Sequence, residues 1–230
     1  AAMATTASCQ FVASAHHADA QLETLLMAVL RGAGPRGMRG VAPTRPLDSG
    51  VTLIRPMLVV TRREAEHLCQ QAGWTWTEDQ TNQDTTKLRA HVRHVLIPAL
   101  EDIRPGAGQR AARSASLMRQ VPRLIDIRAE QVWVLGKVRY GQGSSPMLYS
   151  WSRDVLREET GLVVGEILRR AASDLLGGRG LDRIGHKQLD RVVGSIRSRS
   201  GEAKEFHWHA TRVEVSKDSV VIRRDEEGTS

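Results

Sequence analysis

The sequence predicts a mostly α-helical protein of the α/β class, built from two modest domains. Three patterns predict this class. A short apolar stretch at residues 11–15 precedes an amphipathic helix, helical stripes recur as far as residue 197, and alternating residues near the C-terminus have the pattern of a β-hairpin. With 230 residues and 40% hydrophobic composition, the chain is long enough to bury a core.

The first element is predicted to be a strand, a turn and a helix. Residues 11–15 (FVASA) are typical of a buried strand, and apolar residues then follow one helix face at Leu22, Leu25, Leu26, Val29 and Leu30. Asp19 can cap the first turn and Gly32 can end the helix. In an open α/β sheet such a turn lies where ligands bind. An ordinary helix start needs only the cap, but this one also holds His16, His17, Gln21 and Glu23.

The middle of the chain has further helix signals. Thr61 and Glu64 form a capping-box pattern at the start of a short helix that ends at Gly73. A polar loop follows through residue 84, and a second helical stripe runs from Leu88 to Leu100, where Pro98 should kink or restart the helix. Residues 104–106 (RPG) break the pattern, and we therefore expect one domain over 1–104 and another over 105–230.

The second domain is predicted to be helical with a closing hairpin. Helices are expected around residues 108–133, 152–176 and 186–197, separated by glycine-rich stretches at 141–145 and 177–180. The alternation in residues 206–215 and 220–222, around Lys217 and Asp218, predicts a terminal β-hairpin.

Charge and cysteine content narrow the function classes. Residues 105–200 hold 17 Lys and Arg, of which 15 are Arg, against 9 Asp and Glu, whereas the rest of the chain is nearly balanced. Such an arginine excess suits phosphate, and nucleic acid is the natural partner for it, although a charge run taken alone is more often a solvated helix face. Cys9 and Cys69 form no metal or disulfide pattern, and no run is apolar enough to span a membrane. We expect a soluble, cytoplasmic protein.

Four motifs occur in an order that resembles the tRNA(Ile)-lysidine synthase family of N-type ATP-pyrophosphatases. The first motif is HHADAQLET, at residues 16–24, and the second is RGAGPRGM, at residues 31–38. The third is IRPML, at residues 54–58, and the fourth joins EDQTNQD, at residues 78–84, to the stretch LRAHVR…LIPAL, at residues 88–100. The resemblance is specific over residues 10–104 and looser over residues 105–224, which correspond to the tRNA-binding part of the family.

The resemblance implies an ATP-dependent ligase that adenylates C2 of the wobble cytidine in isoleucine tRNA, after which a lysine amino group displaces AMP. It also implies ATP, Mg²⁺, lysine and isoleucine tRNA as ligands, and a homodimer is a further expectation. By position, Asp19 and Glu23 are the expected catalytic and magnesium-binding acids. The expected adenylate-binding residues are His16, His17, Arg31 and Gly32. The expected substrate- and tRNA-binding residues of the first domain are Asp79, Asn82, Asp84, Arg89 and Arg93, with ion pairing to Asp79 or Asp84 as the alternative for the two arginines.

In the second domain we expect tRNA to contact arginines that lie in pairs on or near predicted helices. These are Arg110, Arg113, Arg169, Arg170, Arg197 and Arg199.

The sequence departs from the family pattern at three places. The glycine-rich pyrophosphate motif S-G-G-x-D-S does not occur in the 230 residues, Ala20 stands where the family has a second aspartate, and Ala90 stands where it has asparagine. Backbone amides of such a loop cradle the ATP phosphates. Since the motif does not occur in this sequence, we expect the chain to be the C-terminal part of a nucleotide-binding domain with a parallel sheet, followed by a substrate-binding domain. The alternative function is a non-catalytic RNA-binding remnant of the family.

Overall fold

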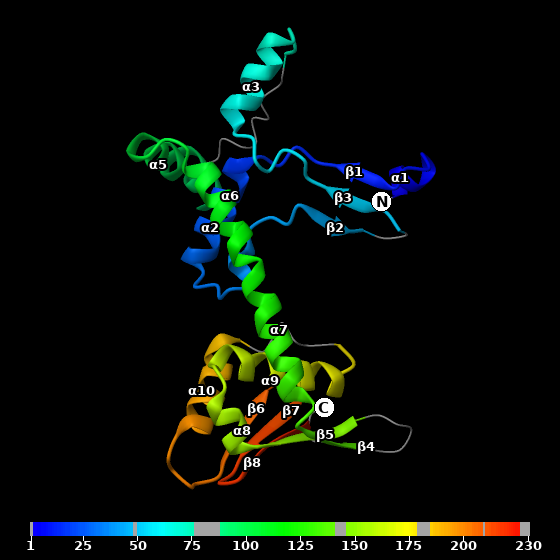
Figure 1. Ribbon diagram of the computed structural model, residues 1–230, viewed down its shortest axis with the longest axis vertical. Coiled ribbons are helices and arrows are strands. Elements are labelled where there is room, and N and C mark those ends of the chain that lie inside the picture. Colours follow the sequence, from blue (N-terminus) through cyan, green and yellow to red (C-terminus); the bar gives the residue numbers. More distant parts are fainter. Residues whose placement is uncertain are drawn as a thin grey trace. The chain divides into compact units, whose positions relative to one another are not determined.

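The computed structural model describes residues 2–47, 50–75, 88–140, 146–178, 185–208 and 210–225 (Figure 1). The chain forms two compact units, Ala1–Pro122 and Arg123–Ser230. This division falls later than the expected boundary after residue 104. Helix α6 (Ala107–Met118), which the sequence analysis placed in the second domain, packs on α2 (Ala18–Leu30) in unit 1. The RPG break therefore separates two helices of one unit, and the small buried residues Ala111 and Ala115 let α6 pack closely there.

Unit 1 contains a three-stranded sheet in the order β1-β3-β2. Strand β1 (Phe11–Ala13) runs parallel to β3 (Thr52–Ile54), and β2 (Thr44–Pro46) runs antiparallel to β3. A short helix, α1 (Ala2–Thr6), precedes β1. The expectation of a buried first strand is wrong within the described structure, because Phe11 is 59% exposed and β1 has only β3 as a described neighbour.

The helices of unit 1 surround a small core made by Leu22, Val92, Ile97 and Ala111. Besides α2 and α6, unit 1 contains η1 (Gly37–Arg39), α3 (Arg62–Gln71), α4 (Leu88–His91), the π-helical η3 (Val92–Leu96) and α5 (Ile97–Ile103). Pro98 lies in the first turn of α5, directly after the π-helical turn, and the backbone stays helical across this junction.

Two local sequence signals act as expected in unit 1. At the start of α3 the Glu64 backbone N–H donates to Thr61 Oγ1 over 3.1 Å, and the Thr61 N–H donates to Glu64 Oε2 over 2.7 Å. This is the predicted capping box. At the end of α2, Gly32 has a φ of 63°, a left-handed conformation that favours glycine and ends the helix.

Unit 2 is built around a five-stranded antiparallel sheet in the order β4-β5-β8-β7-β6. Its strands are β4 (Lys137–Tyr140), β5 (Pro146–Ser152), β6 (Lys204–Trp208), β7 (Thr211–Val215) and β8 (Ser219–Arg224). Strands β7 and β8 pair antiparallel across residues 216–218, where the alternation predicted a hairpin. Helices α8 (Arg153–Glu158), α9 (Gly161–Leu175) and α10 (His186–Arg197) pack on the sheet, and α7 (Gln120–Trp133) contains the division between the units.

The main core of the described chain lies between this sheet and its helices. Trp151, Ile167, Val213 and Ile222 are almost fully buried in it. Tyr149 Oη donates to Asp174 Oδ2 over 2.9 Å, and burial together with this carboxylate raises the pKa of Tyr149 to about 12. An entirely helical second domain was expected before the hairpin, and strands β4 and β5 correct that expectation.

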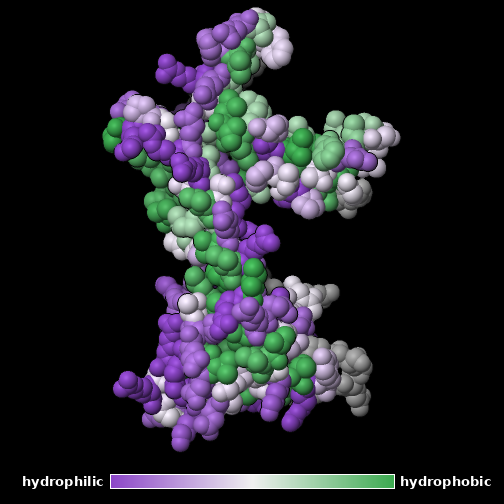
Figure 2. Space-filling view, in the orientation of Figure 1, coloured by the Kyte–Doolittle hydropathy of each residue, from purple (hydrophilic) through white to green (hydrophobic). Residues whose placement is uncertain are grey.

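Among the described residues, no helix is long and apolar enough to cross a bilayer. Hydrophobic patches are nevertheless exposed among the hydrophilic surface in Figure 2. Part of this surface comes from α7, where Leu124 is 66% and Ile127 is 49% exposed.

Candidate active site on helix α2

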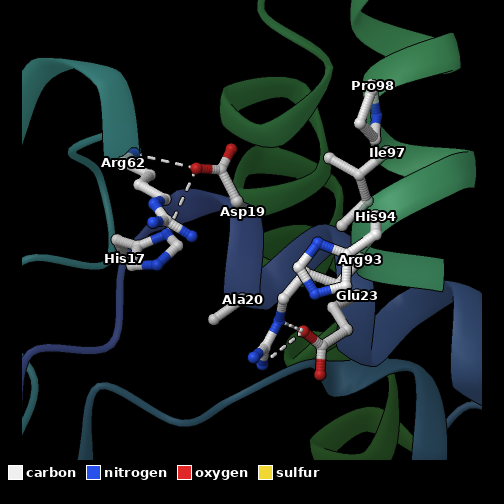
Figure 3. Close-up of a pocket in the computed structure, with 9 residues that line it drawn as sticks. All are labelled: His17, Asp19, Ala20, Glu23, Arg62, Arg93, His94, Ile97 and Pro98. Carbon is white, nitrogen blue, oxygen red and sulfur yellow. Dashed lines mark hydrogen bonds and ion pairs between the residues drawn. The ribbon is translucent and has the colours of Figure 1, made fainter. Parts of the chain in front are cut away.

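A cavity of about 400 Å³ lies beside the first turns of α2 (Figure 3). Its lining comes from α2, from the start of α3 and from the η3–α5 segment. The lining residues are His17, Asp19, Ala20, Glu23, Arg62, Arg93, His94, Ile97 and Pro98. The cavity thus gathers both expected catalytic acids, and it also includes Arg62, His94, Ile97 and Pro98, which the sequence analysis did not select as site residues.

The Asp19 side chain lies between its own helix, α2, and the first turns of α3 and α6. Its Oδ2 accepts a hydrogen bond of 2.8 Å from the backbone N–H of Arg62 and lies 3.2 Å from His17 Nδ1. Burial raises the pKa of the Asp19 carboxyl, but the hydrogen bonds from His17 and from the Arg62 N–H outweigh burial and lower it overall. The side chain was expected to cap its own helix. It caps α3 instead, because α3 begins beside the carboxylate while His17 is the N-cap of α2.

The other Asp19 oxygen lies against the first turn of α6. A Cβ atom built on Gly108 would be only 2.6 Å from Asp19 Oδ1, so no side chain fits between them without movement. Glu101 holds that turn in place, since its carboxylate accepts from the N–H groups of Gly106 and Gly108 over 2.7 and 3.0 Å. The position of the Asp19 carboxylate is therefore set by α2, α3 and α6 together.

Glu23 is buried and ion-paired with two arginines. Arg93 Nε donates to Glu23 Oε2 over 2.9 Å, and Arg89 Nε donates to Glu23 Oε1. The Glu23 side chain is 5% exposed, whereas those of Arg93 and Arg89 are 40% and 67% exposed. These arginines were expected to contact a ligand or to pair with Asp79 or Asp84, and in the described structure both pair with Glu23.

Gln21, between the two acids, has a structural role. Its amide donates to the Val41 carbonyl and accepts from the Val41 N–H, each over 2.8 Å, and its side chain is almost fully buried. Ala20 lies on the cavity wall and offers no polar group. The glutamine of the motif thus ties α2 to the segment before β2, and the polar lining contributed by α2 is confined to Asp19 and Glu23.

Three other residues expected to bind the adenylate, His16, Arg31 and Gly32, lie outside the cavity lining. His16 contacts Ser14 Oγ through Nδ1 over 2.9 Å, and burial followed by the charge of Arg55 lowers its pKa. Arg31 and Gly32 are exposed at the far end of α2. Asp79, Asn82 and Asp84 lie outside the described residues.

The described residues do not fit a protein-held Mg²⁺ ion. The Asp19 Oδ2 and both Glu23 oxygens already accept from donors of this chain, and no group of three or more metal-ligating side chains occurs among the described residues. A hexacoordinate Mg²⁺ needs several free oxygen ligands, water included.

Several arginines of the second half have partners within unit 2. Arg128 pairs with Glu159 at 2.5 Å, Arg170 pairs with Glu130 and lies 5.4 Å from the centre of the Trp133 ring, and Arg197 donates to the Glu159 carbonyl over 3.0 Å. Arg170 and Arg197 were expected to contact tRNA, and their guanidinium groups are at least partly engaged inside the unit. In unit 1, Arg110 donates to the Pro105 carbonyl over 2.6 Å.

Burial does not separate the other three expected tRNA contacts from these. Arg113 and Arg199 are exposed, as Arg110 and Arg197 are, and Arg169 is half-buried on α9 like Arg170. Arg113, Arg169 and Arg199 stay predicted tRNA contacts.

Comparison with known proteins first identifies the class of domain formed by the N-terminal residues. Residues 1–100 match the PP-loop domain family, which binds ATP. The chain is 42% identical over 110 residues to tRNA(Ile)-lysidine synthase of Vibrio campbellii, covering 48% of this chain and 24% of that protein. It is 38% identical over 149 residues to the synthase of Pseudomonas fluorescens, covering 65% and 32%. These matches span a third or less of each relative.

A longer match covers nearly the whole chain. The tRNA(Ile)-lysidine synthase of Nostoc sp. is 30% identical over 234 residues, covering 98% of this chain and 67% of that protein. The chain therefore belongs to the tRNA(Ile)-lysidine synthase family, whose members are ATP-binding ligases that modify tRNA.

Proposed function

We propose that the chain is part of an ATP-dependent ligase that joins lysine to C2 of the wobble cytidine of isoleucine tRNA in the cytoplasm. The observation that carries this proposal is that Asp19 and Glu23, on the acidic motif shared with the family, line one cavity together with Arg62 and Arg93. A preorganised set of acids and arginines of this kind can orient a cationic amine and offset the charge of a phosphate.

In the proposed reaction ATP transfers AMP to the cytidine with release of pyrophosphate, and the lysine amino group then attacks C2 and AMP leaves. The lowered pKa of Asp19 keeps its carboxylate ionised at neutral pH, so it can accept a hydrogen bond from the amine or the base. Glu23 holds Arg93 at the cavity and also pairs with Arg89, which lies outside the lining. Any Mg²⁺ is expected to enter with ATP, bound mainly by its phosphates.

The second candidate is a non-catalytic RNA-binding protein of the same family. Ala20 favours it, because no polar group occupies the place of the family's second aspartate. The engagement of the Glu23 carboxylate by two arginines favours it as well. The expectation that two copies of the chain form a homodimer stays a prediction.

The test is transfer of radiolabelled lysine to an isoleucine tRNA transcript with and without ATP. We expect transfer by the product of the full gene. The 230-residue chain should not catalyse it and should bind ATP with a Kd above about 1 mM, because S-G-G-x-D-S does not occur in it. A full gene product that binds the tRNA but transfers no lysine would support the non-catalytic candidate.

A further inference from the structure

The face of the unit 2 sheet that lies opposite its helices carries a row of basic residues. Cross-strand partners share a face, so the pairing register identifies the row. It runs from β4 to β6 through Arg139, Leu148, Arg223, Arg212 and His207. The next row on the same face begins with Lys137, Ser150 and Val221.

Alternation along the strands shows that this face is the outer one. Tyr149 and Trp151 of β5 are buried in the core with helices α8, α9 and α10, so Leu148, Ser150 and Ser152 point to the opposite side. Lys137, Arg139 and Arg223 are exposed there. Helices α8, α9 and α10, which make the main described contacts with the sheet, contribute residues to the core on the other face.

Charge is unevenly distributed over this outer face. Toward β6, Arg212 pairs with Glu205 and Asp225 at 2.9 and 3.2 Å, and His207 contacts the same two acids at 3.0 Å, so acids surround the basic residues at this end of the face. Arg223, in the middle, pairs with Glu214. Toward β4, the described cross-strand neighbours of Lys137 and Arg139 are Ser150 and Leu148, which carry no negative charge.

We propose that the outer-face patch, made of Lys137, Arg139, Ser150 and Arg223, is a docking surface for the phosphate backbone of RNA. Lys137 and Arg139 supply cationic donors and Ser150 supplies a hydroxyl, which are groups that bind phosphate without reading sequence. Lys137 and Arg139 are two residues apart on β4 and therefore lie on the same face, next to Ser150 on β5. The inference rests on the proposed function, because it takes tRNA as the RNA.

The patch also indicates which basic residues of the second half would contact RNA. Helix arginines such as Arg153, Arg170 and Arg197 contact carbonyls, acids or a tryptophan of their own unit. The strand cations Lys137 and Arg139 are exposed and lie opposite neutral residues. Sequence reasoning favoured helices for tRNA contact, and the pairing register points to the sheet.

The test compares two matched double variants of the full 230-residue chain, with an isoleucine tRNA transcript as the probe. Lys137→Gln with Arg139→Gln neutralises the patch, and Lys187→Gln with Arg191→Gln neutralises one exposed lysine and one exposed arginine on α10. Gel-shift titrations at several salt concentrations give the affinity and its salt dependence, and thermal melting confirms that both variants are folded.

We expect the patch variant to bind about tenfold more weakly at 100 mM salt. Its log–log salt slope should be less steep by about 1.5, since each phosphate contact contributes roughly 0.7 to 0.9. The α10 variant should bind like the unmodified chain, and Arg139→Lys, which keeps the charge, should retain most of the slope.

Two outcomes would overturn the proposal, and they are distinguishable. If the unmodified chain binds tRNA but the α10 variant loses as much affinity as the patch variant, the patch is wrong and RNA binding stands. If the unmodified chain binds no tRNA at low salt, both the patch and the RNA-binding part of the proposed function fail.

Discussion

At the scale of single residues, the contact between Gly108 and Asp19 offers a sharp test of the site geometry. Gly108→Ala should destabilise the protein by about 1 to 3 kcal/mol, because the new methyl group overlaps Asp19 Oδ1. In an Asp19→Ala background the same substitution should be neutral or stabilising, since the overlap is removed and alanine favours a helix. Urea unfolding of the four proteins of this double-mutant cycle measures the coupling.

Gly194→Ala is the matched control for that cycle. Gly194 lies within α10, and a Cβ atom there would meet no atom within 4 Å. The control should therefore gain up to about 1 kcal/mol from helix propensity alone. Equal effects of Gly108→Ala with and without the Asp19→Ala substitution would show that α6 does not set the position of the carboxylate.

In the cluster of Glu23, Arg89 and Arg93, removing the two arginines should reduce the stability of the protein more than removing the acid. Replacing both Arg89 and Arg93 with alanine leaves a 5% exposed carboxylate without its ion-pair partners and should cost about 3 kcal/mol or more. Glu23→Gln should cost less, because both arginine side chains are partly exposed and can be hydrated. Urea unfolding at pH 7 distinguishes these results, and a larger loss for Glu23→Gln would contradict the account.

Residue-level sequence reasoning located the acids of the candidate site but not their partners. Asp19 and Glu23 are four residues apart on a predicted helix, which places them on one side, and the cavity contains both. Gly108 and Arg62 approach Asp19 from helices far along the chain. Helical periodicity reports neighbours within one helix, so it carries no signal for such contacts.

At the scale of elements, Arg153 at the start of α8 ties three segments of unit 2 together. The buried guanidinium donates to the carbonyls of five residues over 2.7 to 3.1 Å, namely Ser195, Ile196, Ser198, Ser200 and Ser216. Three of these acceptors lie at the end of α10, where a cation also complements the helix dipole.

Arg153→Lys should therefore destabilise unit 2 by about 2 to 5 kcal/mol, since an ammonium group has three donors and leaves buried carbonyls unsatisfied. Arg157→Lys is the control, because Arg157 is exposed and shares two of these carbonyl acceptors, Ile196 and Ser198. The control should lose under about 1 kcal/mol. Similar melting temperatures for both variants, measured by circular dichroism, would refute this role of Arg153.

Elements with strong local signals are predictable from this sequence. The α3 capping box depends on Thr61 and Glu64 alone, and α10 begins and ends where its apolar spacing predicts, at His186 and Arg197. Strand β5 was missed although Tyr149 and Trp151 alternate with Ser150 and Ser152. That stretch is short and lies between the glycine-rich residues 141–145 and the helix expected from residue 152, so it was assigned to no element.

At the scale of the whole molecule, net charge located the basic half but not the residues that serve a partner. Formal charge counts Arg128 and Arg153 equally with Arg139, yet the first two contact groups of unit 2 and the third is exposed on the outer sheet face. Which arginines are free for RNA depends on pairing and burial, which only the folded chain determines. The domain boundary similarly depended on the packing of α6 on α2.

The assignment of the α2 cavity as the reaction site can be tested directly by the rate of lysine transfer to isoleucine tRNA. The rate is measured for two variants of the full gene product, one carrying Asp19→Asn and the other carrying Asp102→Asn. Asp102 is an exposed carboxylate on α5 outside the cavity lining. If the cavity on α2 is the reaction site, Asp19→Asn should lower kcat by about a hundredfold or more while Asp102→Asn changes it little. Equal activity of the two folded variants would contradict the assignment of this cavity as the active site.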